Sequence, residues 1–147
     1  MGGSLDFWKL RMRPGAPVGF GRVLGVPWIG LPGNPVSTMV TFELFVRPAI
    51  RAMAGHRRPF RRATQVRAAE HISLRPTLQH FLRAVVTDSA AGPEARLTGP
   101  QGSGILTSMV RANALLVVPE GQHETPKGSQ MSAIVLNDPI HATEPGF

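Results

Sequence analysis

The sequence predicts two successive parts, an α/β segment and a β segment that folds as a small barrel or sandwich. In residues 1–57, a strand–loop–helix pattern contains apolar side chains at helical spacing. In residues 64–147, short β-like runs are separated by Gly, Pro, Asn and Asp. A basic stretch, residues 55–62, lies between the two parts. A chain of 147 residues has room for one ordinary domain or two small ones.

Short extended segments open the first part. Residues 6–12 alternate polar and apolar side chains well enough for one strand, and residues 18–23 and 26–31 predict two more. The run from Pro14 to Pro17 predicts a turn, because proline fixes φ and glycine permits a positive φ. Arg13 precedes this turn and could face a ligand crevice beyond the strand ends. A solvated surface arginine is the alternative.

A long helix is predicted for residues 35–54. Asn34 suits the N-cap, and Pro35 suits the first helical position, where its missing N–H costs nothing. Gly55 suits the C-cap, and Pro48 is expected to remove one backbone hydrogen bond and kink the helix. The apolar positions at helical spacing are Val36, Met39, Val40, Phe42, Phe45, Val46, Ala49, Ile50 and Met53.

The loop before this helix is a candidate anion site. A helix N-terminus presents unpaired N–H groups and a partial positive charge. Gly33 lets a ligand approach the backbone, and Ser37 adds a hydroxyl near the first turn. Pro32 and Pro35 bracket Asn34 and stiffen the loop, which favours a preorganised site. The alternative is an ordinary strand-to-helix connection with good capping residues.

The second part is predicted to contain strands at residues 64–72, 79–88, 94–97, 114–118 and 132–136. Residues 90–93 predict a hairpin loop, and residues 105–113 predict a short helical turn. Between them lies a glycine-rich loop with Gln101, Gly102 and Ser103. Successive backbone N–H groups in such a loop can bind an anion, although a mobile connection is the alternative.

Composition excludes several kinds of chemistry. The chain has no cysteine, which removes disulfides, thiolate metal sites and a cysteine nucleophile, and fits a reducing cytosol. The histidines show no zinc-ligand spacing, and the few acidic residues do not form a recognisable carboxylate site for magnesium. Neither a leader nor an apolar run long enough for a bilayer is present, so we expect a soluble cytoplasmic protein.

The net charge of +7 comes almost entirely from arginine, since Lys9 and Lys127 are the only lysines. Arginine suits two-pronged recognition of phosphate, carboxylate or other oxyanions. A general bias toward arginine codons is the alternative explanation. Charge alone therefore indicates only that an anionic partner is possible.

Three stretches resemble one known family. Residues 30–55, which include Pro32-Gly33-Asn34-Pro35, closely resemble the signature of the MoeA/gephyrin molybdopterin molybdenumtransferases. Residues 6–21 look like that family's strand and Lys-Pro-Gly-Lys-Pro turn, and residues 98–121 look like the Gln-Gly-Ser loop and following strand of its C-terminal barrel. The similarity covers nearly the whole chain in the expected order, which is more specific than any single motif.

The resemblance implies a fold and a reaction. Residues 1–57 would be the C-terminal portion of an α/β/α molybdopterin-binding domain, residues 58–63 a basic linker, and residues 64–147 a small C-terminal β-barrel domain. The reaction would insert molybdate into adenylylated molybdopterin with release of AMP. A divalent cation such as Mg²⁺ would assist, with ligands that are not in this chain. The full-length family members are expected to be homodimers.

The resemblance also implies site residues, position by position. Arg13 stands where the family usually has the first lysine of its turn, so a charge is kept with a different geometry. Ala16 stands where the second lysine usually is, which weakens the case for molybdate binding. Arg83 is the best match to an anion-contacting arginine of the barrel. No catalytic residue is assigned. The predicted substrate- or anion-binding residues are Arg13, Pro32, Gly33, Asn34, Pro35, Ser37, Arg83, Gln101, Gly102 and Ser103.

Full-length members of the family also carry an N-terminal region, an elongated second domain and the first half of the α/β domain. A partial enzyme of this kind would leave an apolar sheet face and edge uncovered, so we expect strong association or dependence on the missing half. Two rival functions remain open. One is a nucleic-acid-binding module with the basic run of residues 57–67, which is disfavoured because Phe81 and Phe147 are the presumed barrel's only aromatics. The other is a non-catalytic scaffold, as in gephyrin.

Overall fold

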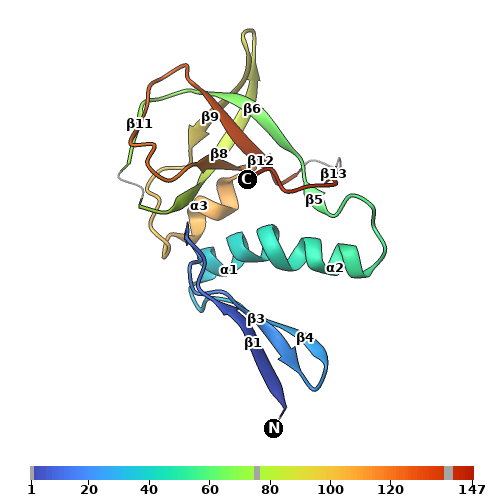
Figure 1. Cartoon of the computed structure of the whole chain (residues 1–147). Coiled ribbons are helices and arrows are strands. Elements are labelled where there is room, and N and C mark those ends of the chain that lie inside the picture. Colours follow the sequence, from blue (N-terminus) through green and yellow to red (C-terminus); the bar gives the residue numbers. More distant parts are fainter. Residues whose placement is uncertain (1, 75–76, 138–140) are drawn as a thin grey trace.

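A computed structural model describes residues 2–74, 77–137 and 141–147 of the chain. The first part contains an antiparallel sheet in the order β1-β3-β4, formed by β1 (Gly3–Trp8), β3 (Gly19–Val23) and β4 (Val26–Gly30) (Figure 1). The strands expected at 18–23 and 26–31 are confirmed. The single strand expected at 6–12 is wrong, because β1 ends at Trp8 and β2 (Met12–Arg13) is separate. Lys9 between them has a φ of 74°, which a strand cannot accommodate.

The predicted helix is present but is built from three joined segments. It runs through α1 (Pro35–Thr41), the π-helical turn η1 (Phe42–Val46) and α2 (Arg47–Met53). The turn η1 comes just before Pro48, the residue that lacks an amide hydrogen and was expected to kink the helix. A π-helical turn changes the backbone pairing locally, so the helical path continues past the proline. Gly55, with a φ of 81°, follows the helix end and confirms the predicted C-cap.

Five strands of the second part close into a barrel in the order β10-β12-β6-β9-β8, since β8 also pairs with β10. The alternative of a sandwich is therefore wrong. The expected strand at 64–72 is divided into β6 and β7, and the predicted helical turn is α3 (Leu106–Arg111). Two short pairs complete the fold: β5 (Phe60–Arg61) with β13 (His141–Ala142), and β7 (Ile72–Ser73) with β11 (Glu124–Thr125). The barrel strands are β6 (Ala63–Ala68), β8 (Gln79–Ser89), β9 (Gly92–Leu97), β10 (Ala114–Val118) and β12 (Gln130–Val135).

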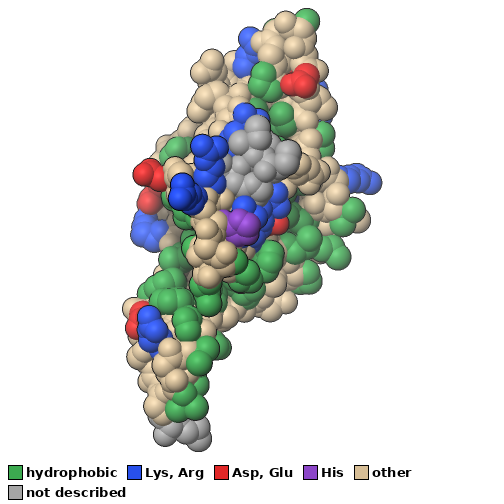
Figure 2. All heavy atoms as spheres, turned by 90° about the vertical axis from the view of Figure 1, so that its right-hand side faces the viewer, with side chains coloured by type: hydrophobic (Ala, Val, Ile, Leu, Met, Phe, Trp, Pro, Cys, Tyr) green, Lys and Arg blue, Asp and Glu red, His purple; other side chains and the backbone are tan. Residues whose placement is uncertain are grey.

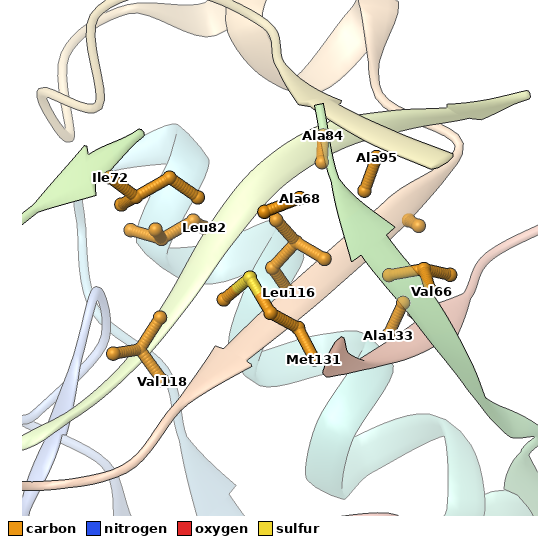
Figure 3. Packing of buried hydrophobic residues seen from close by; sticks show 11 residues of the cluster. Val66, Ala68, Ile72, Leu82, Ala84, Ala95, Leu116, Val118, Met131 and Ala133 are labelled. Carbon is orange, nitrogen blue, oxygen red and sulfur yellow. The ribbon is translucent and has the colours of Figure 1, made fainter. Parts of the chain in front are cut away.

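Two apolar clusters lie on opposite faces of the barrel wall. The interior cluster includes Leu82, Leu116 and Met131, which Figure 3 shows side by side. The second cluster joins Val40 of α1 to Leu115 and other residues of the outer face, so the helix packs on the barrel (Figure 1). Every residue of β10 is buried, because this strand contributes to both clusters. A strand buried on both faces explains the continuous apolar run at 114–118.

Strand β2 attaches the first part to the barrel. It pairs in parallel with the beginning of β8, with Met12 opposite Gln79 and Arg13 opposite His80. Met12 belongs to the second apolar cluster, beneath the helix. This pairing brings the turn that follows Arg13 to the edge of the barrel. The division into domains at residues 57 and 64 stays a prediction.

The sheet of the first part exposes apolar side chains, which gather toward one end of the molecule (Figure 2). Leu5 is 60% exposed and Trp28 is 44% exposed. An apolar cavity of about 370 Å³ lies between this sheet and the helix, where Phe7, Phe20 and Phe45 contribute to its lining. The apolar face expected from the resemblance is therefore present, and its association with a partner stays a prediction. No helix in the described residues is long and apolar enough to cross a bilayer.

Candidate anion-binding site

A cavity of about 370 Å³ lies where the β2 turn, strand β8 and the glycine-rich loop meet. Three of its lining residues, Arg13, His80 and Arg83, carry or can carry a positive charge, and none of the described lining residues is acidic. The lining therefore combines cationic groups with apolar surface, as ligand sites commonly do. The remaining lining residues are Pro14, Leu74, Phe81, Leu82, Gln101 and Gly102.

Close packing against the helix holds the turn that carries Arg13. Gly15 has a φ of 100°, and a Cβ atom built on it would collide with Thr41 Cγ2 of α1. Glycine is thus required for both the backbone conformation and the close approach. The Ala16 carbonyl accepts hydrogen bonds from the amides of Leu10 (2.7 Å) and Val18 (3.0 Å). Ala16 holds the turn through its backbone, and its side chain does not line the cavity.

Arg83 is a buried cation, with 1% of its surface exposed. Its Nε donates a hydrogen bond to Ser108 Oγ of α3 at 3.1 Å, and its Nη2 donates one to the Gly102 carbonyl at 3.0 Å. Burial lowers the pKa of the Arg83 guanidinium from its ordinary value, yet arginine remains charged in proteins. No carboxylate in the described part of the chain pairs with it. A buried charge without a counter-charge is costly, and a bound anion would supply one.

Gln101 holds the glycine-rich loop on strand β8. Its Oε1 accepts a hydrogen bond from the Arg83 amide at 2.8 Å. Its Nε2 donates to the Arg83 carbonyl at 3.1 Å and to the Gly99 carbonyl at 2.9 Å. Both amide hydrogens are therefore in use, and the side chain has no donor left for a ligand. Gln101 therefore positions the loop, and its predicted part in anion binding stays a prediction.

The loop from Pro32 to Pro35 contacts the glycine-rich loop beside the cavity. Asn34 stands at the N-cap of α1, but its side chain does not cap the helix; its Nδ2 donates to Ser103 Oγ at 3.3 Å. Thr38 Oγ1 instead donates to the Pro32 carbonyl. In the described residues, the amides of Val36 and Ser37 donate to no protein acceptor. The amides suggested for anion binding are thus not occupied by the protein, although these residues do not line the cavity.

The structure brings some of the predicted site residues together and separates others. Arg13, Arg83, Gln101 and Gly102 line one cavity, and Asn34 and Ser103 contact each other at its border. The rest lie outside the lining: Pro32 and Ser37 are buried, whereas Gly33 and Pro35 are exposed. The binding roles of all these residues stay predictions.

His80 is the lining residue that sequence reasoning missed. It stands among scattered histidines without metal-ligand spacing, and only the pairing of β2 with β8 brings it opposite Arg13. Burial, and then the nearby charge of Arg13, lower the pKa of His80 from its ordinary value. Its place three residues before Arg83 gave no signal of a shared site, because side chains three apart on a strand leave it on opposite faces.

Nothing in the described residues fits a magnesium ion. No group of three or more His, Asp or Glu side chains gathers there into a possible metal site. Glu43 pairs with Arg61 at 3.0 Å and Arg47 at 3.7 Å. Glu124 accepts a hydrogen bond from Ser73, and its Oε2 lies 2.7 Å from His71 Nε2. These carboxylates already have partners, so no step of a reaction is derived through a metal.

Comparison with known proteins identifies the family. Residues 65–136 match the family described as the MoeA C-terminal region (domain IV), and residues 1–52 match the probable molybdopterin binding domain. Molybdopterin molybdenumtransferase 2 of Mycobacterium tuberculosis is 41% identical over 129 residues, which cover 87% of this chain and 31% of that protein. The molybdopterin molybdenumtransferase of Haemophilus influenzae is 29% identical over 138 residues, covering 92% of this chain and 34% of that protein.

Solved structures agree with these relatives. The molybdopterin biosynthesis moeA protein of Pyrococcus horikoshii superposes with a TM-score of 0.71 at 26% identity, covering 90% of this chain and 32% of that one. A molybdenum cofactor biosynthesis protein of Pyrococcus furiosus gives a TM-score of 0.72 at 27% identity, covering 90% and 45%. The chain spans about a third of the length of the curated relatives it matches. The chain belongs to the MoeA family of molybdopterin molybdenumtransferases and corresponds to its C-terminal part.

Proposed function

We propose that the chain acts in molybdenum cofactor biosynthesis as part of an enzyme that inserts molybdate into adenylylated molybdopterin and releases AMP. The cavity beside β8 is the proposed molybdate site. The observation that supports this most directly is Arg83, a buried guanidinium with no carboxylate partner in the described residues that lines a cavity together with Arg13. A tetrahedral dianion would supply the missing negative charge.

The two arginines have different roles in this proposal. Arg83 is held by Ser108 and Gly102, so its orientation exists before the ligand arrives and little entropy is lost on binding. Arg13 is exposed on a turn held against α1, and it adds a second guanidinium at the cavity. Guanidinium groups bind tetrahedral oxyanions through paired hydrogen bonds, which would orient molybdate toward the second substrate. Mg²⁺ and the homodimer remain expectations from the family, with no described ligand set for the metal.

The rival functions receive less support. A nucleic-acid-binding barrel needs exposed aromatic rings for base stacking, but Phe81 is 1% exposed and packs edge-on against Phe147. Arg61 of the basic run is already paired with Glu43. A non-catalytic scaffold has no need for a buried, uncompensated arginine. We therefore favour the transferase.

Replacing Arg83 with methionine tests the proposal. The Arg83→Met variant keeps most of the side-chain volume and removes the buried charge, so we expect thermal stability equal to or above that of the unmodified chain. Molybdate affinity should fall by about tenfold to a hundredfold, because a hydrogen-bonded charge contributes about 1.5–3 kcal/mol. Calorimetric titration with molybdate measures the affinity, and a thermal melt measures the stability.

Two further variants make the result specific. Arg13→Gln, at an exposed residue, should weaken molybdate binding without unfolding the chain. Arg96→Gln, at an exposed arginine of β9 outside the cavity, should leave the affinity unchanged. The proposal is wrong if the unmodified chain does not bind molybdate, or if Arg13→Gln and Arg83→Met bind it as well as Arg96→Gln does.

A further inference from the structure

His80 lines the cavity together with Arg13 and Arg83. Its partner in the parallel ladder of β2 and β8 is Arg13, and Arg83 is three residues further along β8. The side chain is partly buried and lines the same cavity as both arginines. In the described part of the chain, no hydrogen bond is made by its imidazole. A partly buried imidazole without a protein partner is free to contact a ligand.

We propose that His80 is a third anion contact of this cavity and takes up a proton when a tetrahedral dianion such as molybdate binds. The inference rests on the proposed function, because it requires that the cavity holds an oxyanion. It adds a specific residue and a dependence on pH to that function. Neither follows from the family resemblance.

Burial and one neighbouring charge disfavour protonation of His80 before the ligand arrives. Strand β2 brings Arg13, and β8 itself brings Arg83. Strand β10 brings no titratable group, since Val118 is opposite His80; Glu120 beyond its end pairs with Arg11. Burial, and then the positive charge of Arg13, lower the pKa of His80 from its ordinary value.

A bound dianion would instead favour the protonated form of His80. An opposite charge within a few ångströms favours the protonated imidazole and raises the pKa of His80. The protonated ring has two N–H donors instead of one. Between the pKa of His80 without ligand and its higher pKa with ligand, binding takes up a proton, so affinity rises as pH falls. The limiting slope is about tenfold per pH unit for one proton.

Molybdate titration of the unmodified chain and of His80→Gln is the test. Glutamine keeps hydrogen-bonding capacity but does not titrate. We expect the affinity of the unmodified chain to increase about threefold to tenfold per unit as pH is lowered from about 8 to about 6, the range of histidine titration. Calorimetry in two buffers of different protonation enthalpy should detect proton uptake. His80→Gln should bind with a flat pH profile and no proton uptake.

An independent readout and a matched control complete the experiment. The histidine Cε1–H signal that disappears in His80→Gln should titrate at higher pH in the presence of saturating molybdate. His56→Gln changes an exposed histidine outside the cavity and should keep the pH dependence of the unmodified chain. If molybdate binds but His80→Gln keeps the same slope and proton uptake, the role of His80 is refuted and the molybdate site stands. If the unmodified chain does not bind molybdate at any of these pH values, both proposals are refuted.

Discussion

The barrel and the antiparallel sheet of the first part differ in how far their apolar side chains are buried. Strand β10 is buried on both faces, with Leu116 in the interior cluster and Leu115 in the cluster against the helix. The sheet β1-β3-β4 leaves Leu5 and Trp28 largely exposed. The barrel therefore buries its apolar side chains within this chain, whereas the sheet leaves apolar side chains exposed that a partner could cover.

The candidate site lies where these two regions join. Strand β2 extends the edge of the barrel for two residues, and beyond it the Gln101 carboxamide binds both the amide and the carbonyl of Arg83. Asn113 binds the Val86 backbone in the same way, through its Oδ1 and Nδ2. Both carboxamides satisfy backbone groups of β8, and of the two only Gln101 lines the cavity.

The largest expected effect on stability is in the barrel interior. Replacing Leu116 with alanine should lower the free energy of unfolding by about 2–5 kcal/mol, because the fully buried side chain leaves a cavity. The matched change Leu5→Ala, at a side chain that is 60% exposed, should stay within about 0.5 kcal/mol. Urea unfolding measures both. Equal losses of unfolding free energy in the two variants would show that the sheet is as well packed as the barrel, contrary to the difference in burial described above.

An intermediate effect is expected at the turn that joins the two regions. Gly15→Ala should cost about 1–3 kcal/mol, since alanine is strained at a φ of 100° and its Cβ collides with Thr41. Gly99→Ala is the control, because Gly99 has a φ of 104° but open space around a Cβ. The difference between the two variants isolates the packing of the turn on α1. Molybdate affinity should fall only in Gly15→Ala. An equal loss of affinity in Gly99→Ala would show that molybdate binding does not depend on the packing of the turn against α1.

The smallest effect on stability is expected on the exposed sheet. The double variant Leu5→Ser, Trp28→Ser should change the free energy of unfolding by less than about 1 kcal/mol, because both side chains are exposed. It should nevertheless reduce self-association, since a smaller apolar face gains less from being covered. Sedimentation velocity at several protein concentrations measures the association. A sharply unfolding monomer before any substitution would refute the expected association itself.

Local patterns predicted much of the secondary structure. The strand at 114–118 agrees with β10 at both ends, and Gly55 ends the helix as expected. One error is the single strand at 6–12, which is interrupted at Lys9, where φ is 74°. Asn34 is the N-cap residue as predicted, but its side chain donates to Ser103 Oγ instead of capping the helix. The helix continues past Pro48 with the π-helical turn η1 just before it, and the kink expected at Pro48 stays a prediction.

The sequence by itself predicted the order of elements from periodicity and turn chemistry, which are local in the chain. The resemblance of its motifs to a known family added the family itself, and Arg83 besides Arg13 as a candidate site residue. Only the tertiary structure decided the closure of the barrel, the positioning role of Gln101 and the place of His80 at the cavity. Each depends on the parallel or antiparallel register of strands distant in sequence. That register is set by how the whole chain packs its two apolar clusters.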